Sequence, residues 1–155
     1  MARFAQLDEN NKVLNVIEIA DSDIRDSEGN ESEALGIAKC KTLFDSDTRW
    51  KQTWIGENPS RCRTAVIDGH YDETNDVFTH VKIYPSWVLN TTTYEWEAPT
   101  AEPERIVSEP KEWKWDESST SWVKVDVPEP SEREGGTYSW NTTDGFWVWT
   151  EDTSE

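Results

Sequence analysis

The residues with the greatest catalytic potential in this chain are its two histidines, His70 and His80. A histidine base activates a serine or cysteine nucleophile only when an orienting carboxylate completes the set. Neither histidine is accompanied by a nucleophile elbow, a Gly-rich phosphate loop or an H-E-x-x-H motif. We interpret both as surface or packing residues, and we predict that the chain is not an enzyme and uses no cofactor.

The cysteines and acidic clusters also fail to match a metal site. Cys40 and Cys62 form no close C-x-x-C pair, and the histidines form no H-x-x-x-H pair, so zinc ligation is not indicated and we predict two buried structural thiols. The stretches Asp21–Gly29 and Asp68–Asp76 are rich in carboxylates, but Arg25 falls where an EF-hand loop needs its third oxygen ligand. We interpret both stretches as turns and predict no metal site.

Tryptophan is the residue type that sets this sequence apart. The chain has ten Trp among 155 residues although only 34% of its residues are hydrophobic. Several of them fall in an eight-residue repeat whose first and eighth positions are large and apolar and whose second position is Asp or Asn. The five copies are Leu7–Leu14, Tyr71–Phe78, Leu89–Trp96, Trp115–Trp122 and Trp140–Trp147.

This repeat is typical of a β-hairpin. With a four-residue loop, positions one and eight face each other across the strands, where an aromatic pair contributes roughly 0.2–1 kcal/mol over alanine. The Asx side chain at position two can accept a hydrogen bond from its own backbone two residues on. Asn11, Asn75 and Gly145 are the residues we expect in the left-handed conformation that such loops require.

The other predicted elements build a compact domain over residues 1–99. Ser32 is placed to cap a helix at about 32–44, and a strand is expected at 47–54. The apolar residues at helical spacing in that helix are Ala34, Leu35, Ala38 and Leu43. Hairpins are expected near 4–19, 66–84 and 86–98.

Residues 100–155 have a different composition. Pro-, Glu- and Gly-rich connectors at 97–105 and 126–136 flank two Trp hairpins, at about 111–125 and 137–150. We therefore predict an α+β, mostly β fold: a small antiparallel-sheet domain with one helix, followed by tandem Trp-clamped β-hairpins on extended linkers.

The tryptophans of this second region are the candidate binding residues. An isolated hairpin is marginally stable in water and has too little chain to bury several indoles, so we expect these rings to contact a partner. The candidates are Trp113, Trp115, Trp122, Trp140, Trp147 and Trp149. A flat aromatic platform for sugar rings is the alternative. Packing within the first domain is the interpretation for Trp50, Trp54, Trp87 and Trp96.

The charge of the chain limits its partners further. Lys and Arg number 15 against 32 for Asp and Glu, and the net charge of −17 argues against nucleic acid and anionic membranes. Residues 1–20 show no signal-peptide pattern, and no segment approaches the roughly 20 apolar residues that a bilayer span needs. We expect a protein made in a cytoplasm and not inserted in a membrane.

Several motifs resemble a known family. M-A-R-F-A-Q-L-D-E-N-N, P-S-W-V-L-N and Y-E-W-E-A-P, within about residues 1–100, are similar to short virion structural proteins of tailed phages that infect marine cyanobacteria, as is W-K-W-D-E-S-S-T-S-W-V in the tail. The resemblance implies a component of the virion rather than an enzyme, and it carries over no functional residue.

On this basis we expect an exterior capsid decoration or cement that is attached through its hairpin modules. Its partners would be other virion proteins, first the major capsid protein and second copies of the chain itself. The alternative is a carbohydrate-binding adhesin of the tail or fibre tip that uses the Trp platforms.

Overall fold

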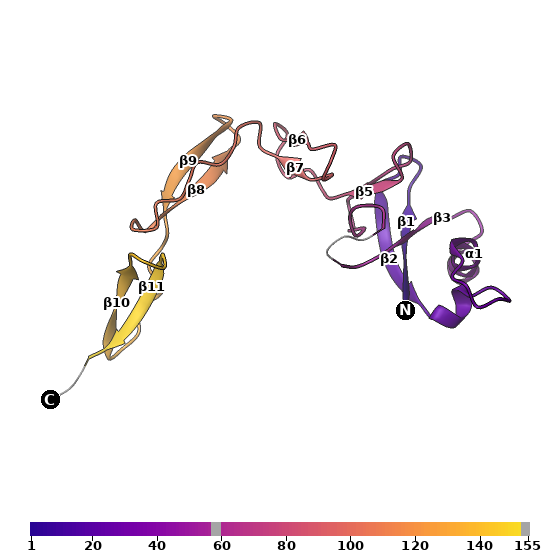
Figure 1. Cartoon of the computed structure of the whole chain (residues 1–155), viewed down its shortest axis with the longest axis horizontal. Coiled ribbons are helices and arrows are strands. Elements are labelled where there is room, and N and C mark those ends of the chain that lie inside the picture. Colours follow the sequence, from indigo (N-terminus) through magenta and orange to yellow (C-terminus); the bar gives the residue numbers. More distant parts are fainter. Residues whose placement is uncertain (57–59, 153–155) are drawn as a thin grey trace. The chain divides into compact units, whose positions relative to one another are not determined.

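A computed structural model describes residues 1–56 and 60–152 and divides the chain into two units, Met1–Glu97 and Ala98–Glu155 (Figure 1). The first unit contains a three-stranded antiparallel sheet of order β2-β1-β3, a short 3-10 helix, the helix α1 and two hairpins; the second contains two further hairpins. The elements of the first unit are β1 (Ala2–Leu7), β2 (Val13–Ile19), η1 (Asp21–Ile24), α1 (Glu33–Leu43), β3 (Arg49–Thr53), β4 (His70–Asp72), β5 (Val77–Thr79), β6 (Val88–Leu89) and β7 (Trp96–Glu97). Those of the second unit are β8 (Lys111–Asp116), β9 (Ser121–Asp126), β10 (Gly136–Asn141) and β11 (Phe146–Glu151). The predicted fold class is confirmed.

The core of the first unit lies on both faces of strand β1. Side chains alternate along a strand, so Ala2 and Phe4 face one side while Ala5 and Leu7 face the other. The first pair packs with α1 and β3, in a cluster that also holds Ile19, Ile24, Cys40 and Trp50. The second pair packs with the β4–β5 hairpin, in a cluster that also holds Val13, Ala65, Tyr71 and Phe78. The central strand is therefore buried from both sides.

Helix α1 begins where the sequence predicted, but it presents another face to the sheet. The Ser32 hydroxyl accepts the backbone N–H of Leu35 at 3.4 Å, which confirms the predicted cap. The apolar residues whose helical spacing indicated the helix, Ala34, Leu35, Ala38 and Leu43, are all exposed. Gly36 and Cys40 are buried instead, because the Phe4 ring lies so close that a Cβ on Gly36 would stand 2.0 Å from Phe4 Cζ. Within residues 1–56 and 60–152, no helix is long and apolar enough to cross a bilayer.

The two cysteines have different environments. Cys40 is fully buried, and this burial raises the pKa of its thiol to about 11. Cys62 is exposed, so its predicted burial is wrong. The chain turns through two consecutive left-handed residues, Arg61 (φ 66°) and Cys62 (φ 61°), and the buried side chain of this loop is the arginine.

Strand pairing confirms four of the five hairpin repeats. Positions one and eight are paired in each of them: Tyr71 with Phe78, Leu89 with Trp96, Trp115 with Trp122 and Trp140 with Trp147. In the first copy Leu7 pairs with Val13, and Leu14 is exposed. The register shifts between Gln6 and Leu7, which shortens that loop by one residue.

The Asx residue at position two closes every loop as predicted. Asp72 Oδ1, for example, accepts the N–H of Thr74 at 2.9 Å, and Asn141 Oδ1 accepts that of Thr143 at 2.9 Å. Asn11 and Gly145 have the expected positive φ, whereas the expectation for Asn75 is wrong. The left-handed residue in the four-residue loops is at position six, which is occupied by Asp76, Tyr94, Thr120 and Gly145.

Candidate partner-binding site

The six candidate tryptophans lie on one face of each hairpin in the second unit. Directly opposed residues and alternate residues along a strand share a face of a two-stranded sheet. In β8–β9 that face carries Trp113, Trp115, Trp122 and Lys124, and in β10–β11 it carries Tyr138, Trp140, Trp147 and Trp149. The structure thus groups the candidates into two sets of three.

The two central pairs have nearly the same geometry. The ring centroids of Trp115 and Trp122 are 5.5 Å apart and those of Trp140 and Trp147 are 5.4 Å apart, each pair at 77°. This is the edge-to-face arrangement that aromatic rings prefer, because the positive edge of one ring meets the negative face of the other. The repeated pattern therefore produces a repeated structural clamp.

The outer positions of each face are occupied by cation–aromatic contacts. Lys124 Nζ lies 5.8 Å from the centre of the Trp113 ring, and the Arg133 guanidinium lies 5.2 Å from that of Trp149. Trp149 also packs against Tyr138, with 4.8 Å between the two ring centroids. Aliphatic stems of the cations cover ring surface that would otherwise face water.

The linkers cover much of what remains. We call residues 98–107 the first arm and residues 127–135 the second arm; neither contains a helix or a strand. Trp115 is 7% exposed, and the other five candidate rings are half-buried. Hydrogen bonds from these rings show that the two arms are bound segments rather than free spacers.

Indole N–H groups bind the arms through main-chain oxygens. Trp122 Nε1 donates to the carbonyl of Thr100 at 2.9 Å, and Trp113 Nε1 donates to that of Glu104 at 3.3 Å. From the other hairpin, Trp140 Nε1 donates to the carbonyl of Val107 at 3.0 Å. The first arm is consequently held by both hairpins.

The tryptophan at position eight behaves alike in three hairpins. Trp147 Nε1 donates to the carbonyl of Val127, in the second arm, at 3.3 Å. In the first unit Trp96 Nε1 donates to the carbonyl of His80 at 2.8 Å. With Trp122, each of these indoles binds the segment that precedes its own hairpin, so arm and hairpin together form the structural repeat.

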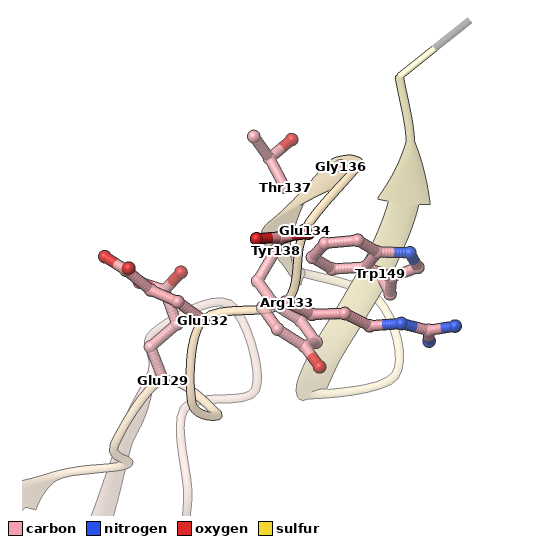
Figure 2. Close-up of a pocket in the computed structure, with 8 residues that line it drawn as sticks. All are labelled: Glu129, Glu132, Arg133, Glu134, Gly136, Thr137, Tyr138 and Trp149. Carbon is pink, nitrogen blue, oxygen red and sulfur yellow. The ribbon is translucent and has the colours of Figure 1, made fainter.

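Trp149 differs from the other candidates. Its Nε1 is buried and has no hydrogen-bond partner among the residues that the structure describes. A cavity of about 590 Å³ lies beside it (Figure 2). The lining residues are Glu129, Glu132, Arg133, Glu134, Gly136, Thr137, Tyr138 and Trp149. Aromatic rings beside carboxylates are the kind of lining that a sugar or a cationic group can use.

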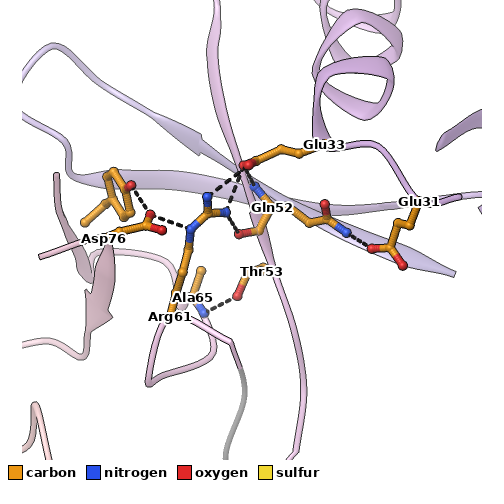
Figure 3. Close-up of polar contacts among 8 residues, drawn as sticks. Glu31, Glu33, Gln52, Thr53, Arg61, Ala65 and Asp76 are labelled. Atoms are coloured by element: carbon orange, nitrogen blue, oxygen red, sulfur yellow. Dashed lines mark hydrogen bonds and ion pairs between the residues drawn. The ribbon is translucent and has the colours of Figure 1, made fainter. Parts of the chain in front are cut away.

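A second group of polar side chains, not predicted from the sequence, surrounds Arg61 in the first unit (Figure 3). Its side chain is 9% exposed, and its Nη1 and Nη2 bind the two Glu33 carboxylate oxygens at 2.8 and 2.9 Å. Its Nε binds Asp76 at 2.6 Å, and its Nη1 also donates to the Gln52 carbonyl at 2.7 Å. Tyr71 donates its hydroxyl to the same Asp76 carboxylate.

The charges around Arg61 stabilise one another. Burial would raise the pKa of Glu33, but hydrogen bonds from Arg61 and from the Gln52 backbone outweigh it and lower that pKa. Burial and the Asp76 carboxylate both raise the pKa of Tyr71. Arg61 thus ties α1, β3 and the β4–β5 hairpin together. We interpret the group as structural, since its charges are already paired.

The histidines and the potential metal ligands do not gather into a site. His70 Nε2 lies 3.0 Å from the carbonyl of Asn10, and His80 is exposed. In the described part of the chain, no three or more His, Cys, Asp or Glu side chains are placed to hold a metal ion.

Comparison with known proteins adds no relative: no family model matches the chain, and neither does any curated protein or solved structure.

Proposed function

We propose that this chain is a non-enzymatic structural protein of a tailed-phage virion, an exterior capsid decoration or cement that attaches through its hairpin modules. The proposal rests on the resemblance of its motifs to short virion proteins and on one structural observation. That observation is the pair of one-sided aromatic faces in the second unit, where six tryptophans gather on two hairpins without a core beneath them.

Such faces suit contacts with another protein. Tryptophan is enriched among the residues that dominate interface energies, because a half-buried ring can lose its remaining water on docking. Two weak sites on one chain also reinforce each other, since binding of the first raises the effective concentration of the second. The proposed partner is the major capsid protein.

The acidic surface is compatible with an exterior position. A net charge of −17 on each copy would keep particles apart. Salt shortens this repulsion to a few ångströms at about 1 M ionic strength, so a high charge is useful in saline water.

Immunogold labelling provides the direct test. Antibodies against the full chain should label the outside of the head on purified tailed phages of marine cyanobacteria. Particles that carry no label, or label confined to the fibre tip, would contradict the capsid assignment.

Paired variants test the binding face. Trp149→Ala removes a ring from the aromatic face of β11, whereas Phe146→Ala removes a 53%-exposed ring from its opposite face. On stripped capsids we expect the first variant to bind at least about tenfold more weakly and the second to bind as the native chain does. The reverse result would assign attachment to the other face.

The cavity beside Trp149 supports a second candidate, a carbohydrate-binding adhesin. Its aromatic rings and carboxylates are suited to stacking on a sugar and accepting its hydroxyl hydrogens. In that case glycans of the host envelope should quench Trp fluorescence of the native chain but not that of Trp149→Ala. The decoration proposal predicts no response from either protein.

A further inference from the structure

The first arm is held in the way that a binding protein holds a peptide. Three of its main-chain carbonyls, at Thr100, Glu104 and Val107, accept indole N–H groups from two different hairpins. One of its side chains, Arg105, donates to the carbonyl of Gly145 at 2.7 Å and lies 5.8 Å from the centre of the Trp140 ring.

These contacts define a ligand of a particular kind. Carbonyl acceptors exist in every residue, so the indoles select an extended backbone rather than a side-chain sequence. Pro99 and Pro103 favour that backbone because proline fixes φ and supplies no N–H for a helix or a sheet. Aromatic surfaces that grip Pro-containing segments are a recurrent mode of peptide recognition. Arg105 adds one sequence-specific contact.

We propose that the aromatic faces of β8–β9 and β10–β11 form a peptide-binding surface, and that in assembled copies this surface takes the first arm of a second copy of the chain. The arm of a neighbour has the same residues and can make the same bonds. Only Ser108, Glu109 and Pro110 separate the arm from β8, so a rearrangement of this short hinge exchanges the arms of two copies.

The protein concentration determines whether a chain binds its own arm or the arm of a neighbouring copy. In dilute solution the chain's own arm is favoured because its tether gives it a high effective concentration. At high density, exchange between neighbours competes without any new contact. The inference deepens the proposed function, since exchange would cement neighbouring copies, but its test requires no virion and can succeed or fail independently of capsid labelling.

A labelled peptide tests the surface on a chain whose own arm cannot compete. A peptide of residues 98–108 with a nitroxide at its N-terminus is added to a full-length acceptor chain that carries ¹⁵N-labelled indoles and has residues 98–107 replaced by Gly and Ser. We expect selective broadening of the Trp122 and Trp140 indole signals, and no such effect from a nitroxide on a Gly-Ser peptide of the same length. An Arg105→Ala peptide should bind about tenfold more weakly, because it loses a hydrogen bond and a cation–aromatic contact. Unselective broadening, or none at millimolar peptide, would overturn the proposal.

Complementation tests the second copy. The acceptor chain is mixed with a donor chain that carries Trp122→Ala and Trp140→Ala. The acceptor has no arm to give, and the donor lacks two of the three indoles that bind an arm, so neither should self-associate, whereas an equimolar mixture should sediment as a heterodimer. If the mixture remains monomeric at concentrations where the peptide binds the acceptor chain, exchange between copies is refuted.

Discussion

The two units of this protein are stabilised in different ways. In the first, a central strand is covered on both faces and side chains such as Phe4, Val13 and Phe78 have no exposed surface. In residues 98–152, the single buried hydrophobic side chain is Trp115. The second unit replaces a core with two aromatic faces, each of them covered by cations and by main-chain segments.

This contrast shows how an acidic, weakly hydrophobic chain can still order its hairpins. A pair of tryptophan rings packs beside each turn, and an indole N–H of the pair donates a hydrogen bond to the arm that precedes the hairpin. Stability in the second unit should therefore depend on the contacts between the arms and the hairpins, whereas the first unit should unfold as a whole.

The largest difference between the units should follow from Phe4→Ala. Phe4 is fully buried between the sheet and Gly36, so its truncation should cost the first unit about 3–5 kcal/mol of unfolding free energy. In denaturant titrations, the transition reported by the Trp50 indole signal should shift to lower denaturant concentration. The transition reported by Trp122 should stay where it is in the native chain. A common shift of both signals would show that the units unfold together.

Removing one charge should give a smaller effect that depends on pH. Glu33→Gln weakens charge-assisted hydrogen bonds to Arg61 and should cost about 1.5–3 kcal/mol at neutral pH. Because the folded-state pKa of Glu33 is lowered, its contribution is present above the ordinary glutamate pKa of 4.5 and is lost as pH falls through the folded pKa.

Acid titration of the native and variant chains measures this contribution. The unfolding free energy of the native chain should fall below about pH 4.5 more steeply than that of Glu33→Gln, and the curves should converge in acid. Parallel curves would mean that Glu33 does not supply the pH dependence.

Trp122→Phe should act locally in the second unit. It removes the N–H that binds the Thr100 carbonyl and some ring area, at a cost of about 1–2 kcal/mol. Hydrogen exchange should then increase in the first arm and in β8–β9 while the first unit is unchanged. Trp50→Phe is the matched control, since its indole donates to Thr48 within the first unit.

The smallest change should be a gain in stability. Position six is left-handed in both hairpins of the second unit, but it is Thr120 (φ 48°) in one and Gly145 (φ 74°) in the other. Left-handed conformation costs a residue with a Cβ about 1–2 kcal/mol, so Thr120→Gly should stabilise β8–β9 by up to about 1 kcal/mol in thermal unfolding.

Gly145→Ala is the opposite substitution and should destabilise β10–β11. A Cβ there would also stand 3.0 Å from Val107 in the first arm. Equal melting temperatures for Thr120→Gly, Gly145→Ala and the native chain would contradict the claim that the left-handed conformation at position six destabilises a residue with a Cβ.

Local patterns in the sequence predicted the fold well where neighbouring residues determine the structure. The spacing of Trp115 and Trp122 and the Asx residue between them were sufficient to predict a hairpin with facing rings. The exposed face of α1 and the exposure of Cys62 depend on contacts with distant residues, which single-sequence patterns do not contain. The left-handed position was assigned to Asn75 from its residue type, whereas the loop geometry requires it at Asp76.

The candidate site was predictable only in part. Strand alternation places Trp113 beside Trp115, and the repeat places Trp147 opposite Trp140. The segments that cover these rings were not predictable, because their acceptors are main-chain carbonyls that leave no signature in residue type. Arg61 was missed for a related reason: its partners Glu33 and Asp76 are remote in sequence.

The use of main-chain oxygens by the indoles has an evolutionary consequence. Substitutions of the side chains at 100, 104 and 107 leave the main-chain carbonyls in place, so the indole hydrogen bonds to them can be kept. A duplicated stretch that contains one arm and its hairpin brings the indole donor, the carbonyl acceptor and the turn together. The second unit can therefore grow by whole arm-and-hairpin repeats without sequence changes in the repeats already present.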